Sequence, residues 1–127
     1  MKKKDNNSFE VVYKYDFASD ILGVKVKRNF IYQETVEMNE GLLLDFDQDN
    51  IPVSLEVHDA SKRFNVPKYS LKEPVFFNMD VNVNEKFIGM NVNIIFLIHN
   101  KEDCHIIEEY TSNKYNIPNI ETELCTA

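Results

Sequence analysis

The chain has 127 residues, of which 43% are hydrophobic and 28% are charged, so it fits one globular domain with an ordinary core. Its 21 acidic and 14 basic residues give a net charge of −7. Because nucleic-acid binding depends on clustered Lys and Arg, this balance argues against DNA or RNA as a partner.

We expect no targeting signal in the first residues of the sequence. Lys2-Lys3-Lys4 is the only basic cluster, and we expect it to lie in a disordered tail over residues 1–8. The polar residues 5–8 follow where a signal peptide would be apolar. The longest apolar run, residues 94–98, is too short to span a bilayer. We therefore expect a cytoplasmic protein that does not bind membranes.

Alternating apolar residues predict the strands of the first half. Residues 9–15 and 22–26 alternate and are expected to form a hairpin. The pattern of residues 28–41 is weaker and is compatible with a short or bulged strand. The run Leu42-Leu43-Leu44 is typical of a covered strand, and residues 53–57 alternate again. An acidic turn separates these last two strands.

A short helix is expected after the strand at residues 53–57. Asp59 is a good N-cap for a helix that begins at Ala60. Pro67 limits this helix to about two turns, which are unstable alone. Phe64 and Val66 are therefore expected to hold the helix on the sheet.

The second half repeats this organisation. Residues 77–83, 88–98 and 104–110 alternate as strands, and a second short helix is expected at residues 111–118. Residues 119–127 are interpreted as a tail.

Two blocks suggest an internal duplication. Residues 60–67 recur as residues 111–118, with every apolar or aromatic position kept in kind, and residues 23–26 match residues 89–92. The sequence predicts an α+β, mostly β fold. In it, two β-meander units, residues 9–67 and a degenerate copy at residues 75–118, are each closed by a short helix and pack as a single domain over residues 1–127.

The first copy also resembles a known family. It contains the blocks Tyr15-Asp16-Phe17-Ala18-Ser19-Asp20-Ile21-Leu22, Leu43-Leu44-Asp45-Phe46-Asp47, Leu55-Glu56-Val57 and Asp59-Ala60-Ser61-Lys62-Arg63. Over about residues 9–66, these blocks resemble the small proteins of domain-of-unknown-function family 2283. The resemblance implies a compact β-rich fold with a short helix, and it implies no established chemistry.

Comparison of the copies locates candidate functional residues. In the second copy, Asp16, Asp20 and Glu56 are replaced by Asn82, Lys86 and Ile107. We therefore predict a functional surface on the first copy, at Asp16, Asp20, Glu56 and Asp59. Two carboxylates such as Asp16 and Glu56 could act as an acid–base pair if neighbouring strands brought them together. Solvated carboxylates on a sheet face are the alternative.

The acidic turn raises the possibility of a metal site. Asp45, Asp47, Asp49 and Glu56 stand at positions 1, 3, 5 and 12 of a calcium loop. The flanking strands and Pro52 favour an acidic β-turn instead. The histidines are not grouped as zinc ligands, and the glycines do not form a phosphate loop, so no cofactor is expected.

One sheet face is expected to be rich in asparagine. It carries Asn78, Asn82, Asn84, Asn91 and Asn93. Such a face fits a protein interface, a carbohydrate-like ligand or a plain solvated sheet. Our leading hypothesis is a non-enzymatic interaction module that binds another protein through its sheet or helix face and that forms a homodimer through a strand edge or a sheet face. The rivals are divalent-metal binding at the acidic loop and a carboxylate-dependent enzyme.

Overall fold

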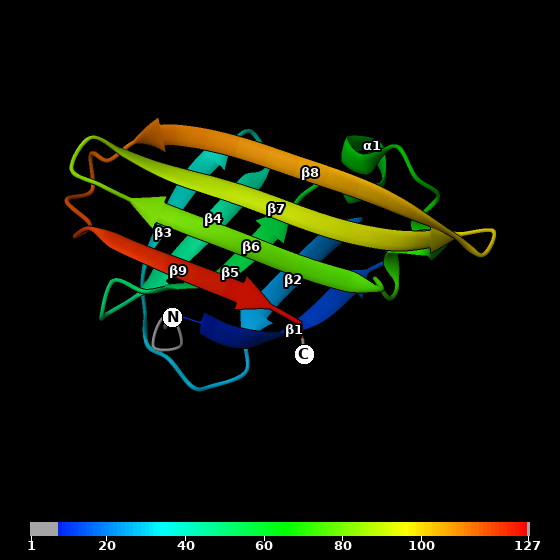
Figure 1. Cartoon of the computed structure of the whole chain (residues 1–127), viewed down its shortest axis with the longest axis horizontal. Helices are drawn as coiled ribbons and strands as arrows, with labels where there is room; N and C mark the ends of the chain where they lie inside the picture. The colour runs from blue at the N-terminus through cyan, green and yellow to red at the C-terminus, as the bar shows by residue number, and fades with distance from the viewer. Residues whose placement is uncertain (1–7, 127) are drawn as a thin grey trace, which may run out of the picture.

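The strands form two layers that cross each other over one core (Figure 1). The computed structural model describes residues 8–126. Its strands are β1 (Ser8–Asp16), β2 (Ile21–Val26), β3 (Tyr32–Asn39), β4 (Leu42–Asp47), β5 (Pro52–Val57), β6 (Phe76–Val83), β7 (Phe87–Ile98), β8 (Lys101–Ser112) and β9 (Ile120–Cys125). They make a nine-stranded mixed sheet in the order β3-β4-β5-β2-β1-β9-β6-β7-β8, which curves into a half-barrel.

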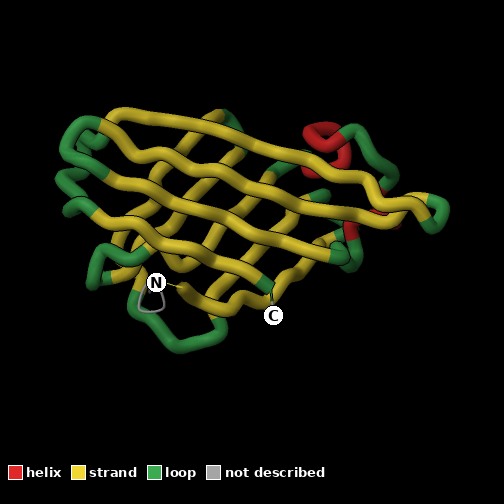
Figure 2. The backbone as a smooth tube through the Cα atoms, viewed as in Figure 1, coloured by secondary structure: helices red, strands yellow, loops and turns green. Residues whose placement is uncertain are grey.

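Strand β1 joins the two layers. Its first residues, Ser8 to Glu10, pair in parallel with β9, and residues 11–16 pair antiparallel with β2. One layer therefore holds β1 to β5, and the other holds β6 to β9 (Figure 2). All remaining pairings are antiparallel.

The core follows from strand alternation. Successive side chains of a strand point to opposite faces, so every second residue of each strand enters the space between the layers. The largest fully buried side chains come from both layers and include Phe46, Leu55, Phe77 and Phe96. Because these residues belong to one hydrophobic cluster, the chain forms a single domain.

Short helical segments close one end of the half-barrel. Helix α1 (Ala60–Phe64) is followed by the 3-10 turn η2 (Lys68–Leu71). The Phe64 ring of α1 meets the Phe96 ring of β7 edge-on, with 5.3 Å between the centroids. The two edge strands of the sheet, β3 and β8, also contact each other. Asn39 Nδ2 of β3 donates a hydrogen bond to Glu109 Oε2 of β8 at 2.9 Å.

Most of the predicted strands are confirmed. The weak pattern of residues 28–41 produces β3, which pairs with β4 through two register shifts, as expected of a bulged strand. The prediction of a tail at residues 119–127 was wrong, since β9 lies inside the sheet between β1 and β6. Its buried Thr122 and Leu124 alternate with outward residues, which is a strand pattern. Of the tail predicted at residues 1–8, only Ser8 is among the described residues.

The second short helix, predicted at residues 111–118, does not form. Thr111 and Ser112 instead complete β8, and a turn follows. Helix α1 begins beside the carboxylate of Asp20, whereas the aligned residue of the second half is Lys86, which cannot accept hydrogen bonds from helix N–H groups. The aligned residues Asn65 and Asn116 do share a left-handed conformation, with φ of 56° and 57°. The duplication itself stays a hypothesis.

The described part of the chain contains no helix with the length and apolar character needed to cross a membrane.

Candidate functional site

Asp20 holds helix α1 against the end of β1. Its Oδ1 accepts hydrogen bonds from the Tyr15 hydroxyl at 2.6 Å and the Ser61 amide at 3.0 Å, and its Oδ2 accepts one from Ser61 Oγ at 2.8 Å. The backbone carbonyl of Asp20 accepts from the Ala60 amide at 3.0 Å. Asp59 was predicted to cap this helix, but its side chain makes no capping bond. Asp20 therefore has a structural role.

These contacts set the charge state of Asp20. Burial opposes its charged form, but the hydrogen bonds from Tyr15 and Ser61 and the nearby charge of Lys68 together lower the pKa of Asp20. Conversely, burial, the hydrogen bond to Asp20 and the negative charge of Asp20 raise the pKa of Tyr15 above its usual range. The pair is thus stabilised with Asp20 ionised and Tyr15 protonated.

Replacing Tyr15 with phenylalanine is expected to raise the pKa of Asp20, because the variant loses a hydrogen bond to the carboxylate. A depressed folded-state pKa stabilises the protein above the unfolded value of about 3.9, and this contribution is lost as the pH falls through the folded value. Carboxyl ¹³C shifts of Asp20 should therefore titrate at a higher pH in Tyr15→Phe. Tyr13→Phe is the control, since Tyr13 donates to the Leu71 carbonyl instead. Equal Asp20 titration in both variants and the native protein would contradict this role for Tyr15.

The other predicted acids do not converge with Asp20. Asp16 Oδ2 accepts from the Ser19 hydroxyl at 2.5 Å at the exposed end of β1. Glu56 lies on β5, where its carboxylate is 3.0 Å from His58 Nε2. Strand β2 separates β1 from β5, so Asp16 and Glu56 are roughly 10 Å apart across the strands. This separation does not allow the acid–base contact that we considered for them.

Acidic residues of the possible calcium loop instead accept hydrogen bonds within and beside the β4–β5 hairpin. Asp47 Oδ1 accepts from the amides of Asp49 and Ile51 at 2.9 and 3.0 Å. Asp45 accepts from the hydroxyls of Thr35 and Ser54 at 2.6 and 2.9 Å. Glu56 lies opposite Leu43. Within residues 8–126, no group of three or more His, Cys, Asp or Glu side chains is placed to hold a metal ion.

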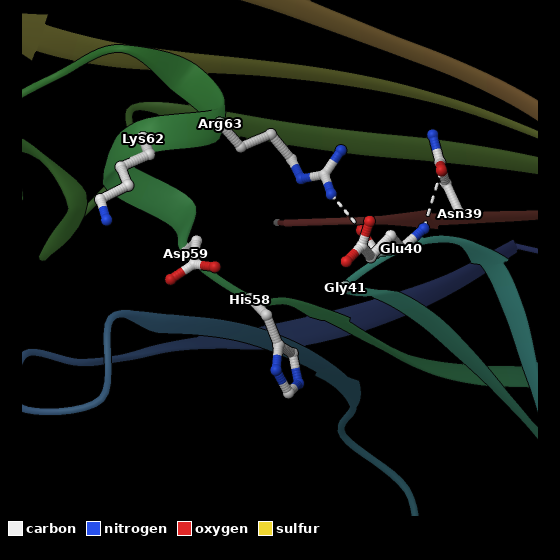
Figure 3. A pocket seen from close by; sticks show the side chains of 7 residues that line it. All are labelled: Asn39, Glu40, Gly41, His58, Asp59, Lys62 and Arg63. Carbon is white, nitrogen blue, oxygen red and sulfur yellow. Dashed lines mark hydrogen bonds between the residues drawn. The ribbon is translucent and has the colours of Figure 1, made fainter.

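A hollow of about 510 Å³ lies between α1 and the β3–β4 turn (Figure 3). It is lined by Asn39, Glu40, Gly41, His58, Asp59, Lys62 and Arg63. Arg63 donates to the Glu40 carbonyl, and the Glu40 amide donates to Asn39 Oδ1 at 2.7 Å. Because both signs of charge line this hollow, its electrostatics do not select a charged ligand. Of the predicted site residues, only Asp59 reaches it.

The outer side of β6 to β9 has a more distinctive composition, and we call it the acidic face. It belongs to the layer of β6 to β9, which is in front in Figure 1. Pairing registers place alternate residues of these strands on it. Its charged strand residues are Asp80, Glu102, Glu108, Glu121 and Glu123, and none is basic.

The acidic face has apolar side chains at both ends. At one end, Phe76, Ile95, Leu97 and Ile106 form what we call the apolar patch, with Ile106 67% exposed. At the other end, the rings of Phe87 and Tyr110 meet edge-on with centroids 5.5 Å apart. Of the predicted asparagines, Asn78, Asn82, Asn91 and Asn93 lie on this face between its ends, whereas Asn84 lies in the turn between β6 and β7. The face therefore combines a polar middle with exposed apolar ends.

Only part of the acidic face was recognised in the sequence. The asparagine-rich side of β6 and β7 was predicted, but β9 was interpreted as a tail. Glu121 and Glu123 were therefore not placed beside Asn82 and Asp80, which are their partners in the sheet. The available signal was the alternation within residues 120–125.

Comparisons with known proteins agree with the family resemblance. A family model described as "Protein of unknown function (DUF2283)" matches residues 13–61, so the acidic face lies outside the match. An uncharacterized protein of Methanocaldococcus jannaschii is 33% identical over 89 residues, which cover 69% of this chain and 75% of that protein. A Methanosarcina mazei protein named "Putative hypoxanthine phosphoribosyltransferase" is 27% identical over 106 residues, covering 84% of this chain and 85% of that protein. No solved structure is significantly similar. Residues 13–61 of the chain therefore belong to the DUF2283 family of proteins of unknown function.

Proposed function

We propose that the protein is a non-enzymatic interaction module whose acidic face binds a basic segment of a partner protein. The observation that carries this proposal is the sign of the charges, since every charged residue that β6 to β9 direct outward is acidic. A surface of one sign attracts partners of the opposite sign and disfavours others. Basic protein segments therefore fit this face better than nucleic acids or acidic proteins do.

The apolar ends would add affinity to this electrostatic attraction. Leu97 is 47% exposed and Tyr110 is 65% exposed, so a partner that covers them removes apolar surface from water. Affinity at protein interfaces is concentrated in a few such side chains, while charges set orientation and association rate. The face thus supports both partner selection and affinity.

The homodimer expected from the sequence would use the apolar patch. Stacking two copies through this patch would bring two acidic faces together, and added salt would weaken their repulsion. Salt would weaken a complex with a basic partner for the same reason. The two associations should therefore respond to salt in opposite directions, which light scattering and titration calorimetry can measure separately.

The name of the Methanosarcina mazei relative suggests phosphoribosyl transfer as a second candidate function. Proteins bind phosphate groups with helix N-termini, glycine-rich loops or basic clusters. The strands of the acidic face place only carboxylates among their outward charges, which would repel such substrates. Product formation from hypoxanthine and phosphoribosyl pyrophosphate would favour this second candidate.

Neutralising the acidic face is expected to weaken binding of a basic peptide. The test is calorimetric titration with hexalysine at low salt, comparing the native protein with a Glu102→Gln/Glu108→Gln/Glu121→Gln variant. If each exposed charge contributes about 0.5 kcal/mol, the variant should bind about tenfold more weakly.

A matched variant controls for net charge. Asp16, Glu37 and Glu56 point outward from β1, β3 and β5 of the other layer, so changing these three to asparagine or glutamine alters the net charge equally. This control should retain most of the affinity for hexalysine. An equal loss in both variants, or no binding by the native protein, would refute a specific role for the acidic face.

A further inference from the structure

We propose that a hollow on the acidic face receives an arginine side chain of the basic partner, an inference that rests on the proposed function. The hollow has a volume of about 390 Å³ and lies at the end of the face that carries Phe87 and Tyr110. Strand β6 contributes Asp80 and Asn82 to its lining, and β7 contributes Gly89 and Asn91.

The aromatic side of the hollow depends on Gly89. A Cβ atom on this residue would lie 2.7 Å from Tyr110 Cε1 and 2.9 Å from Cδ1, which is closer than side-chain contacts allow. Glycine therefore lets the Tyr110 ring lie directly against the β7 backbone. With Tyr110 65% exposed and Phe87 beside it, a ligand can contact aromatic surface.

The polar side of the hollow is rich in hydrogen-bond acceptors. Asn91 Nδ2 donates to Glu108 Oε2 at 3.4 Å, while Asn91 Oδ1 is buried and has no hydrogen-bond partner among the described residues. Because Asn91 Oδ1 is shielded from solvent, the acceptors that a ligand can reach are on the exposed side chains of Asp80 and Asn82. The carboxylate of Asp80 adds a negative charge to the same lining.

This combination fits a guanidinium group better than other ligands. Arginine carries five N–H donors, no acceptor and a planar cation that stacks on aromatic rings. A phosphate or carboxylate would meet the charges of Asp80 and Glu108. A lysine ammonium would also be attracted by the negative charge, but it lacks the flat surface that stacks on Tyr110.

The experiment compares hexa-arginine with hexalysine, peptides of equal length and charge, by calorimetric titration of the full chain. We expect hexa-arginine to bind about tenfold more tightly, as a stacked cation with added hydrogen bonds would provide. The Tyr110→Ala variant should bind the two peptides with about equal affinity, and its affinity for hexalysine should be nearly that of the native protein. Free arginine should bind more weakly than the peptide, because the source of the guanidinium is a protein segment.

Two further variants control this test. Phe76→Ala removes an exposed aromatic ring at the opposite end of the acidic face and should keep the arginine preference. Gly89→Ala retains Tyr110 but displaces its ring, so it should lose the preference while its amide NMR spectrum still shows a folded protein. Together, these two variants show whether the arginine preference depends on the hollow or on any exposed aromatic ring.

The outcomes distinguish the two proposals. If neither peptide binds, the proposed function fails, and the arginine site fails with it. If both peptides bind equally, or if Tyr110→Ala weakens both to the same extent, the acidic face stands and the arginine site is refuted.

Discussion

Replacing Phe96 with alanine is expected to lower the free energy of unfolding by about 4 kcal/mol, the typical cost of removing a buried phenylalanine. Phe96 is fully buried on β7 and lies edge-on to Phe64 of helix α1, with 5.3 Å between the ring centroids. It also lies 5.8 Å from the ring of His105 on β8. The substitution therefore leaves a cavity where the second layer meets the helix. Urea denaturation at neutral pH measures the loss.

The adjacent residue is a matched control for Phe96. Leu97 points to the acidic face and is 47% exposed, so Leu97→Ala should cost less than about 1 kcal/mol. The two substitutions affect the same strand, and only one opens a cavity. Similar losses of stability in both variants would show that Phe96 is not part of a close-packed contact between the layer and the helix.

Replacing Asp20 with alanine is expected to destabilise the protein by about 3 kcal/mol, because hydrogen bonds to a buried carboxylate are stronger than neutral ones. The change leaves the Tyr15 hydroxyl and both Ser61 donors without their acceptor. Asp20 also has a φ of 61°, which alanine adopts less readily than aspartate. Thermal and urea unfolding should both report the loss.

Two other substitutions separate the contributions to this effect. Asp20→Asn keeps an acceptor oxygen and tolerates the left-handed backbone, so it should lose about half as much stability. Asp16→Ala removes an exposed carboxylate at the other end of the same turn and should cost less than about 1 kcal/mol. A small effect of Asp20→Ala would contradict the structural role of this carboxylate.

The binding surface that we propose lies on a different half of the chain from the functional surface predicted by comparing the two copies. The sequence placed function with the acids of the first half, whereas we propose that binding occurs on the second. Asp20 shows why residue type alone was insufficient. Asp20 is only 8% exposed, and its carboxylate accepts hydrogen bonds from Tyr15 and Ser61, so it is not accessible to a ligand.

The sequence by itself determined most of the strands and which of their residues are buried. Alternation is a local property, so it predicted β6 and β7 and the asparagines between their buried residues. The order of several short sequence blocks in the first half also indicated the family resemblance, which is confirmed over residues 13–61. The same pattern was compatible with a short or bulged strand in residues 28–41, where the structure has β3 at residues 32–39.

Tertiary structure decided which strands became neighbours and what the outward residues formed together. Residues 120–125 resemble a tail by position, but they become β9 because β1 and β6 each leave a strand edge for them to pair with. Helix α1 forms and its counterpart does not, because a carboxylate distant in sequence reaches only the first. The acidic face likewise exists only after long-range pairing aligns Glu108, Asp80 and Glu123, because register between separate strands is not encoded in any one of them.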